Sequence, residues 1–227
     1  RRDIHQHPEL AFEEERTSAL VSEKLKKWDY EVEKVVGTGV VANLKKDFSG
    51  KTIAIRADMD ALPLEEKTDL YYKSKNPGKM HACGHDAHTA IALGAAKILS
   101  LYKDKVKGNV KFIFQPAEEK PPGGAKFVIE EGHLDDVNMI FGLHINTQYP
   151  LGFIGVNRGS AMSSTDPFEV ELIGEGGHAG LPHKTIDPMI MASRFINEVQ
   201  YIVSRKNDPV EPLAISLGCI EGGKEKN

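Results

Sequence analysis

The sequence has only two cysteines in 227 residues, so it cannot be a small fold that depends on several disulfides. We expect a reducing, cytoplasmic setting. No apolar run is long enough to cross a bilayer, and no signal peptide is visible, although the chain opens without a methionine and looks trimmed. The net charge of −4 comes from interspersed acids and bases, which gives no basic patch for nucleic acid. The composition is that of a soluble globular protein with neither membrane nor nucleic acid as partner.

One stretch is unusually dense in side chains that bind metal: Met80-His-Ala-Cys-Gly-His-Asp-Ala-His88. Cys83 and His85 form its centre, because a thiolate and an imidazole two residues apart can point at one spot where the chain turns tightly. Gly84 between them permits such a turn, since it has no Cβ. The alternative is a solvated loop that happens to carry histidines. A second set of candidate ligands downstream favours a metal site.

Strands and helices are predicted to alternate through the first 145 residues. Apolar patterns predict strands over 40–44, 51–57, 110–115 and 139–145, and helices over 9–28, 86–102 and 124–132. This alternation indicates an α/β fold, a mostly parallel sheet flanked by helices. Asp86 is predicted at or near the N-cap of the helix after the metal-binding stretch, whose positive end favours a thiolate. His88 falls on the apolar face of that helix and is predicted to be packed rather than to bind metal.

Acidic residues and a histidine follow the predicted strands directly. Asp58 and Asp60 come after the strand over 51–57, Glu118 and Glu119 after that over 110–115, and His144 lies near the end of the last. The carboxyl ends of parallel strands form the usual site edge of such a sheet, so we expect these side chains to gather there. An ordinary acidic turn is the alternative for Asp60, and a core histidine is the alternative for His144.

The residue types indicate hydrolytic metal chemistry. Cys83, His85, Glu119 and His144 would offer sulfur, nitrogen and oxygen, a mixture that suits zinc best, with cobalt, manganese or nickel possible. Asp58 and Asp60 are candidates to orient these ligands. Paired Cys-x-x-Cys ligands, typical of structural zinc, are absent. Glu118 would remain free to take a proton from an attacking water and pass it to a leaving group, as hydrolysis of an amide bond requires.

The character of the sequence changes near residue 163. A strand with one buried face is predicted over 168–172, then a helix that begins at Asp187-Pro188, then a last strand over 213–219. Cys219 is predicted to be a small buried hydrophobe on that strand. The helix is expected to bury one stripe of side chains: Met191, Phe195, Val199 and Ile202. These elements indicate a small second domain of the α+β type.

Several segments together resemble the two-metal amidohydrolase and carboxypeptidase family, which includes aminoacylases, hippurate hydrolases, auxin-conjugate hydrolases and some thermophilic carboxypeptidases. The resemblance runs along the whole chain, and its carriers are RRDIHQHPEL, RADMDALP, MHACGHDAHTA, FQPAEE, FGLHI and GGHAGLPHKTIDP. It implies a catalytic metal-binding domain over 1–163 and a lid and dimerisation domain over 164–227, with the active protein a homodimer. Both domains would be incomplete, because the family's catalytic domain ends in a segment that supplies a last histidine ligand.

The resemblance also implies roles for residues of this sequence. Cys83 would bridge two divalent metal ions, with His85, Glu119 and His144 as further ligands. Glu118 would be the general base and acid.

Three further positions match the family, and one, Arg56, departs from its commonest pattern. Asp58 would be a supporting carboxylate, and Arg56 stands where most relatives have a histidine ligand. His178 matches a lid histidine that reaches the partner subunit's active site, where it would stabilise the oxyanion and contact substrate. Asn227 matches a lid asparagine that contacts substrate.

The sequence therefore predicts metal-dependent hydrolysis of the amide bond of N-acyl amino acids or of C-terminal peptide bonds. The alternative is a non-catalytic metal- or peptide-binding protein that retains the fold. A thiol redox protein built on Cys83 is disfavoured, because no second cysteine lies near it in the sequence.

Overall fold

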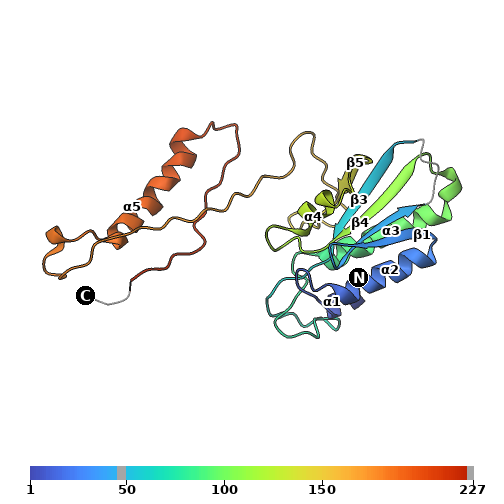
Figure 1. Cartoon of the computed structure of the whole chain (residues 1–227), viewed down its shortest axis with the longest axis horizontal. Helices are drawn as coiled ribbons and strands as arrows, with labels where there is room; N and C mark the ends of the chain where they lie inside the picture. The colour runs from blue at the N-terminus through green and yellow to red at the C-terminus, as the bar shows by residue number, and fades with distance from the viewer. Residues whose placement is uncertain (45–49, 224–227) are drawn as a thin grey trace. The chain divides into compact units, whose positions relative to one another are not determined.

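The computed structural model describes residues 1–44 and 50–223 and divides the chain into two compact units, Arg1–Gly155 and Val156–Asn227 (Figure 1). Asn227, a predicted substrate contact, lies outside the described residues. Among the described residues, no helix combines the length and apolar composition that a membrane span needs.

The first unit is built on a five-stranded sheet in the order β1-β2-β4-β3-β5. The strands β4, β3 and β5 are parallel, as predicted, whereas β2 and β1 join the edge beside β4 in antiparallel pairing. The antiparallel pairing of β1 with β2 follows from the short turn between them, since a parallel connection needs a long crossover. Sequence patterns did not predict β1. The strands are β1 Tyr30–Val35, β2 Gly39–Leu44, β3 Thr52–Asp58, β4 Asn109–Gln115 and β5 Val137–Gly142.

Helices cover both faces of this sheet. On one face α2 and α3 pack on Phe112 and Phe114 of β4, around a core that includes the fully buried Leu25. On the other face α4 packs on Ile113 through Val128. Alternation along β4 sends its side chains to opposite faces and so explains both cores. The helices are α1 Arg2–Gln6, α2 Glu15–Lys27, α3 His85–Leu101 and α4 Gly124–Glu130, with a 3-10 turn at Lys103–Lys105.

The start of α3 lies within one residue of the sequence prediction, and Asp86 lies near the N-cap, as predicted. Gly84, not Asp86, is the N-cap, in a left-handed conformation with φ of 89°, and the helix begins at His85. Asp86 lies inside the first turn, fully buried, where it accepts hydrogen bonds from Arg1 Nε at 2.8 Å and His5 Nδ1 at 3.0 Å. The Asp86 carboxylate, which could have capped the helix, is therefore hydrogen-bonded to Arg1 and His5 instead.

The parallel strands end together at one edge of the sheet. Asp58 at the end of β3 lies opposite Gln115 at the end of β4, and Arg56 pairs with Gly142 at the end of β5. The loops after these strands therefore leave the sheet side by side. The N-terminus of α3 faces the same edge, since Thr89 Oγ1 donates to the Asp58 carbonyl at 2.8 Å.

The second unit contains α5 Pro188–Tyr201, capped by the Asp187 side chain, which accepts a hydrogen bond from Met189 N. A 3-10 turn at Pro182–Lys184 precedes this helix, and a π-helical turn at Ile202–Lys206 follows it. The strands predicted over 168–172 and 213–219 do not form. An isolated strand leaves its backbone groups without ladder partners, so one-sided patterning alone does not make a sheet.

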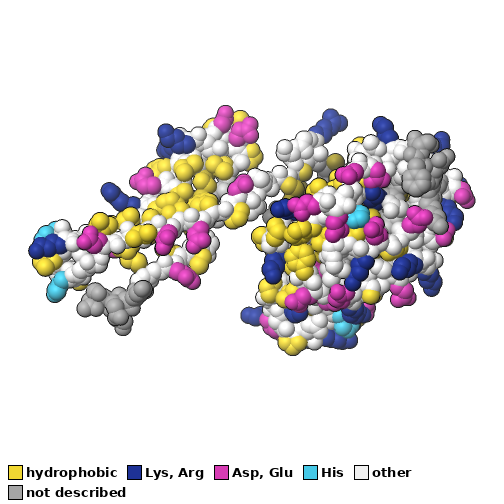
Figure 2. Space-filling model, viewed as in Figure 1, with side chains coloured by type: hydrophobic (Ala, Val, Ile, Leu, Met, Phe, Trp, Pro, Cys, Tyr) yellow, Lys and Arg dark blue, Asp and Glu magenta, His cyan; other side chains and the backbone are white. Residues whose placement is uncertain are grey.

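The apolar side chains of the second unit are largely exposed, as Figure 2 shows over α5 and the chain beside it. Of the predicted stripe on α5 only Val199 is buried. The prediction that Cys219 is buried is wrong, because its segment forms no strand and its side chain is exposed.

Candidate metal centre

The residues predicted to bind metal converge at the edge where the parallel strands end. Cys83 and His85 come from the turn into α3, Glu119 from the loop after β4, and His144 from the chain after β5. Three groups of donor atoms each lie within 4.8 Å of one another: Cys83, His85 and His144; Asp58, His85 and His88; and His85, Glu118 and Glu119. The common member of the three groups is His85.

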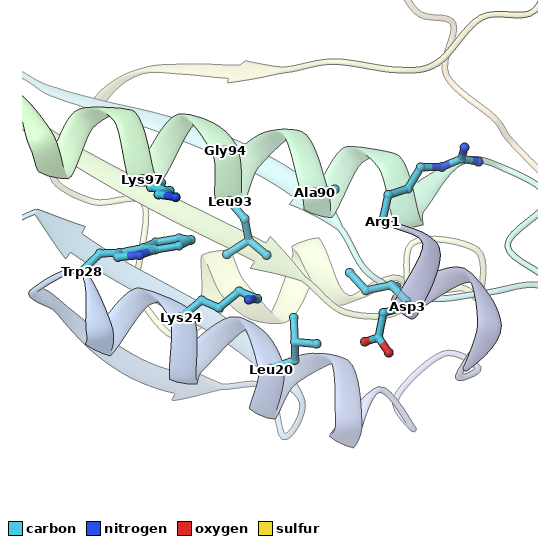
Figure 3. A pocket seen from close by; sticks show the side chains of 10 residues that line it. Arg1, Asp3, Leu20, Lys24, Trp28, Ala90, Leu93, Gly94 and Lys97 are labelled. Carbon is cyan, nitrogen blue, oxygen red and sulfur yellow. The ribbon is translucent and has the colours of Figure 1, made fainter. Parts of the chain in front are cut away.

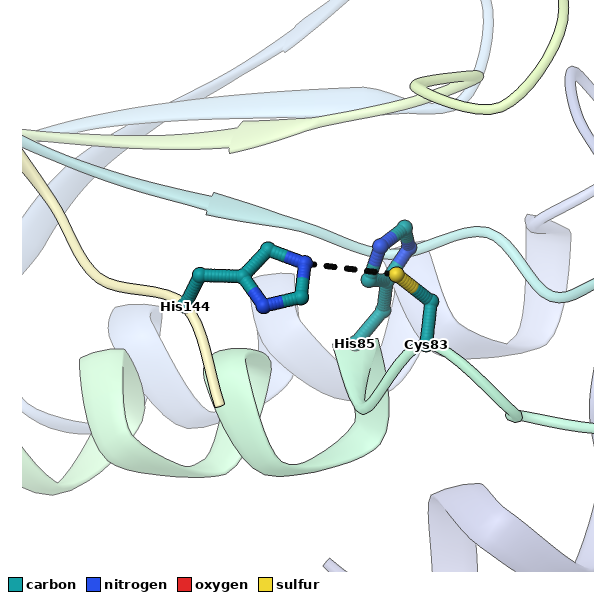
Figure 4. A group of neighbouring side chains, drawn as sticks. All are labelled: Cys83, His85 and His144. Atoms are coloured by element: carbon teal, nitrogen blue, oxygen red, sulfur yellow. Dashed lines mark hydrogen bonds between the residues drawn. The ribbon is translucent and has the colours of Figure 1, made fainter. Parts of the chain in front are cut away.

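The ring of His144 points at the thiol of Cys83 (Figure 4). The two atoms, His144 Nε2 and Cys83 Sγ, lie 3.3 Å apart. His144 Nδ1 lies 2.7 Å from the carbonyl oxygen of Ile145, which can only accept, so Nδ1 donates and Nε2 keeps its lone pair toward the sulfur. This is the tautomer that a metal ligand requires.

His85 is oriented in the same way by Asp60. Its Nδ1 lies 2.9 Å from the Asp60 carbonyl and 3.2 Å from Asp60 Oδ1, so the proton sits on Nδ1. Its Nε2 is buried and has no hydrogen-bond partner among the described residues. That nitrogen faces three carboxylates, Asp58 Oδ2 at 3.7 Å, Glu119 Oε1 at 3.8 Å and Glu118 Oε2 at 4.0 Å.

The carboxylates around His85 also shift its pKa. Burial by itself lowers the pKa of an imidazole, but the hydrogen bond to Asp60 and the charge of Asp58 outweigh it and raise the pKa of His85. The unpartnered Nε2 of His85 therefore lies among negatively charged carboxylates.

Asp58 is an ionised carboxylate held between two donors. Arg56 Nη1 donates to its Oδ2 and His88 Nδ1 to its Oδ1, each at 2.7 Å. Burial opposes ionisation, yet the bond from His88 and the charge of Arg56 prevail and lower the pKa of Asp58 to about 2. Asp58 lies beside His85 as a fixed negative charge at neutral pH.

The two glutamates after β4 differ in their surroundings. The backbone N–H of Glu119 donates to Asp60 Oδ2 at 2.9 Å, and Glu119 Oε1 is buried without a hydrogen-bond partner in the described chain. The side chain of Glu118 is 41% exposed. Burial and the neighbouring Glu119 carboxylate raise the pKa of Glu118. Glu119 therefore presents a buried oxygen without a hydrogen-bond partner in the described chain, whereas the Glu118 carboxylate is open to solvent.

Cys83 is held as a thiol by its surroundings. Burial, followed by the carboxylates of Glu119, Glu118 and Asp58, raises the pKa of Cys83 to about 12. The helix N-terminus predicted to favour the thiolate is thus outweighed by negative charge. A divalent cation between these groups would reverse that balance. The bare His85 Nε2, the orphaned Glu119 Oε1 and the thiol facing His144 therefore fit a metal.

Two further histidines singled out in the sequence, His88 and His178, lie in different parts of the chain. His88 is buried, and both of its nitrogens are engaged, Nδ1 with Asp58 and Nε2 as acceptor of the Ile145 N–H at 2.9 Å. It has no lone pair left for a metal, which agrees with its prediction as a packed histidine. His178 belongs to the second unit, where its exposed ring accepts a hydrogen bond from Gly180 N at 2.9 Å.

Sequence reasoning missed several buried polar residues beside the centre. Glu14 is completely buried under the loop after β4. His5 lies between Asp86 and Glu66, at 3.0 and 3.2 Å. His81 is inside the metal-binding stretch but has no hydrogen-bond partner in the described chain, and burial lowers its pKa to about 4. Only His81 carried a local signal; the partners of the other two lie far away in the sequence.

A cavity of about 440 Å³ lies away from this centre, between α1, α2 and α3 (Figure 3). Leu20, Trp28 and Leu93 point into it, and its lining is mainly apolar. None of the candidate ligands lines it.

Known proteins resemble the chain over its whole length. It is 47% identical to thermostable carboxypeptidase 1 of Saccharolobus solfataricus, covering all of this chain and 58% of that protein. It is 43% identical to an N-acyl-L-amino acid amidohydrolase of Geobacillus stearothermophilus, covering all of this chain and 62% of the relative. The chain thus spans about three fifths of the length of these relatives.

A solved structure and a family model agree with these relatives. The Bacillus subtilis YXEP protein, described as a dinuclear metal binding peptidase from the M20 family, is 48% identical with a TM-score of 0.66, covering 70% of this chain and 44% of that one. The model of peptidase family M20/M25/M40 matches residues 54–216. This stretch includes all the candidate ligands, and the chain belongs to peptidase family M20/M25/M40.

Proposed function

We propose that the whole protein hydrolyses the amide bond of N-acyl amino acids or the C-terminal peptide bond of peptides, with the help of two divalent metal ions. One observation carries this proposal: His85 Nε2 and Glu119 Oε1 are buried and unpartnered in the described chain beside a half-exposed Glu118. Such buried donor atoms can bind cations, while the carboxylate of Glu118 stays free to act as a base. The names of the relatives, a carboxypeptidase and an amidohydrolase, support the same reaction class.

Cys83, His85, Glu119 and His144 would be the ligands that this chain offers to the two ions. Zinc fits the mixed donor set best. Bound there, the ions would polarise the scissile carbonyl and lower the pKa of the attacking water. Asp60 and Ile145 would keep the ligand tautomers of His85 and His144 in place through the hydrogen bonds to their Nδ1 atoms.

Glu118 would move the proton. Its raised pKa brings it nearer to neutrality, where a group can both accept a proton and return it. Glu118 would take the proton of the attacking water and later deliver it to the departing amine. Asp58, ionised and held by Arg56, would keep the surroundings of His85 negative.

The second unit would contribute the lid and the dimer. In this proposal residues 164–227 form a lid and dimerisation domain, and His178 reaches the partner subunit's centre, where it stabilises the oxyanion and contacts substrate. Asn227 would contact substrate as well. Residues 1–163 form the catalytic domain in the same scheme.

The decisive experiment compares Glu118→Gln and Cys83→Ala with the unaltered full-length protein. Metal content is measured by elemental analysis, and turnover is measured on a panel of N-acyl amino acids and peptides before and after chelation. We expect Glu118→Gln to keep about two metals and lose turnover, because it can bind but not accept a proton. Cys83→Ala should lose metal.

Three other results would contradict the proposal. Retained turnover in Glu118→Gln would remove its role as base, and unchanged metal content in Cys83→Ala would remove Cys83 as a ligand. Metal without turnover on any substrate of the panel would indicate the alternative, a binding protein that retains the fold.

A further inference from the structure

Glu14 lies outside the candidate ligand set but contacts the loop that carries Glu118. Its side chain, just before α2, is completely buried. Its Oε1 accepts the backbone N–H of Ala117 at 2.7 Å, and its Oε2 accepts the hydroxyl of Thr38 at 2.5 Å. Glu14 and Ala117 are 103 residues apart in the sequence. This carboxylate therefore connects the start of α2 to the residue before the proposed base.

Ala117 has an unusual backbone. Its φ is 49°, in the left-handed region, which costs a residue with a Cβ roughly 1 kcal/mol or more. Both of its peptide groups are engaged: its N–H bonds to Glu14, and its carbonyl accepts the N–H of Gly124 at 2.9 Å. A strained conformation persists only where the surroundings hold it. Glu14 supplies one of the two hydrogen bonds that do so.

Asp60 holds the same turn from the other side. Its Oδ2 accepts the N–H of Glu119 at 2.9 Å, while its Oδ1 and carbonyl orient His85. The backbone on either side of Glu118 is thus bonded to two separate carboxylates, Glu14 at Ala117 and Asp60 at Glu119. The turn leaves the Glu118 carboxylate 4.0 Å from His85 Nε2.

A buried carboxylate at this position is costly for the fold itself. Burial raises the pKa of Glu14, and the bonds from Thr38 and Ala117 only partly offset that effect. An apolar side chain would fill the same space without desolvating a charge. What only a carboxylate or an amide oxygen can provide there is an acceptor for the Ala117 N–H.

We propose that Glu14 is a positioning residue for the reaction, which fixes Ala117 in its left-handed conformation and so places Glu118 beside the metal ligands. The inference rests on the proposed function of Glu118. It assigns no chemistry to Glu14 itself, which acts through the backbone.

The first test compares Glu14→Ala and Glu14→Gln in the full-length, metal-loaded protein. Glutamine keeps an oxygen for the Ala117 N–H and can donate its amide to the Thr38 oxygen, so its kcat should stay within about threefold of the unaltered value. Alanine removes the acceptor and should lower kcat by roughly 10²-fold with little change in KM, since a small misplacement of a catalytic group has that effect.

Glu9→Ala is the matched control. Glu9 also accepts from a backbone N–H and a threonine hydroxyl, both of Thr17 at 2.8 Å, but it bonds the start of α2 rather than the loop after β4. This variant should lose stability without the fall in kcat. An equal fall in kcat in Glu9→Ala and Glu14→Ala would overturn the proposal.

A rescue experiment separates positioning from simple destabilisation. Glycine adopts positive φ without the steric cost of a Cβ. Ala117→Gly, introduced into the Glu14→Ala protein, should therefore recover at least about tenfold of the lost kcat. A double variant as slow as Glu14→Ala would contradict the proposal.

Hydrogen–deuterium exchange of the peptide over residues 115–124 gives a readout independent of turnover. Glu14→Ala should speed exchange at Ala117 and Gly124, with and without metal, whereas Glu14→Gln and Glu9→Ala should not. Unchanged exchange in Glu14→Ala, or faster exchange with unchanged kcat, would overturn the inference. If the unaltered protein shows no hydrolysis, the proposed function fails, and the exchange data still decide whether Glu14 holds the turn.

Discussion

His88 donates from Nδ1 to Oδ1 of Asp58 at 2.7 Å, and this bond ties α3 to the end of β3. The proton must sit on Nδ1, because Nε2 accepts the N–H of Ile145. The neutral ring therefore links Asp58 to the chain that carries His144. A histidine predicted from the sequence to fill core space also orders two neighbours of the metal centre.

The first prediction concerns this link. His88→Ala should lower metal affinity by roughly 10- to 100-fold, since it removes a donor from Asp58 and an acceptor from the His144 segment. His88→Asn is the control, because its amide nitrogen can lie near the position of Nδ1 and keep the donor to Asp58. Affinity is measured by titration of the chelated protein with zinc. Equal affinity in His88→Ala and the unaltered protein would contradict the prediction.

The second prediction is a pH dependence of stability that originates at Asp58. Its pKa is about 2 in the folded protein against a reference of 3.8, so folding favours the ionised form. The stabilisation, about 2 kcal/mol, is present above pH 4 and is lost as the pH falls through 2. Urea unfolding of the chelated protein measures it.

The comparison needs two variants. The gap in unfolding free energy between the unaltered protein and Asp58→Asn should be widest near neutral pH and should shrink below pH 4. Asp69→Asn, at an exposed position, should show no such narrowing. If the difference in unfolding free energy between the unaltered protein and Asp58→Asn is the same at pH 2 and pH 7, the Asp58 carboxylate is not the source of the pH dependence.

The third prediction concerns the reactivity of Cys83 without metal. Its pKa of about 12 lies about three units above the reference of 9.0, so at pH 8 its thiolate is roughly 10³-fold scarcer than that of an ordinary thiol. Iodoacetamide should label the exposed Cys219 long before Cys83, as mass spectrometry of the chelated chain can follow. Rapid labelling of Cys83 would mean that the carboxylates around it do not suppress the thiolate.

The fourth prediction concerns the turn between Cys83 and His85. Gly84 has φ of 89°, and an added Cβ would lie 3.3 Å from Ile145. Gly84→Ala should therefore destabilise the protein by about 1 to 2 kcal/mol and weaken metal binding, because the two ligands flank it.

Gly78→Ala is the matched control for backbone strain. Gly78 has φ of 71°, and nothing lies within 4 Å of its added Cβ, so alanine there meets the same conformational cost away from the ligands. The temperature of thermal unfolding should fall in both variants, whereas zinc affinity should fall only in Gly84→Ala. A similar loss of affinity in both would mean that global destabilisation is the cause.

Local patterns predicted the parallel part of the sheet well. The run over 110–115 is apolar at four of its six positions because both faces of β4 are covered, and this is how the sequence reveals a central strand. The antiparallel β1 was not predicted, although Tyr30 and Val32 alternate with Glu31 and Glu33 as in a strand with one buried face, and no local feature shows which strand it pairs with. The strands predicted at 168–172 and 213–219 failed for a related reason: alternation shows that one face is apolar, not that a neighbour covers it.

The sequence by itself determined which donor side chains the candidate centre can offer. Short-range features of the sequence reveal these side chains. Cys83 and His85 stand on either side of a glycine, and Glu118 and Glu119 are adjacent after an apolar strand. Only the tertiary structure decided which ring nitrogens and carboxylate oxygens lack a hydrogen-bond partner and so remain available to a ligand. The tautomer of His85 depends on Asp60, 25 residues away, and the turn before Glu118 depends on Glu14, 103 residues away. Such partners meet because strands order the loops at one edge of the sheet, and a hydrogen bond between distant residues leaves no periodic trace in the sequence.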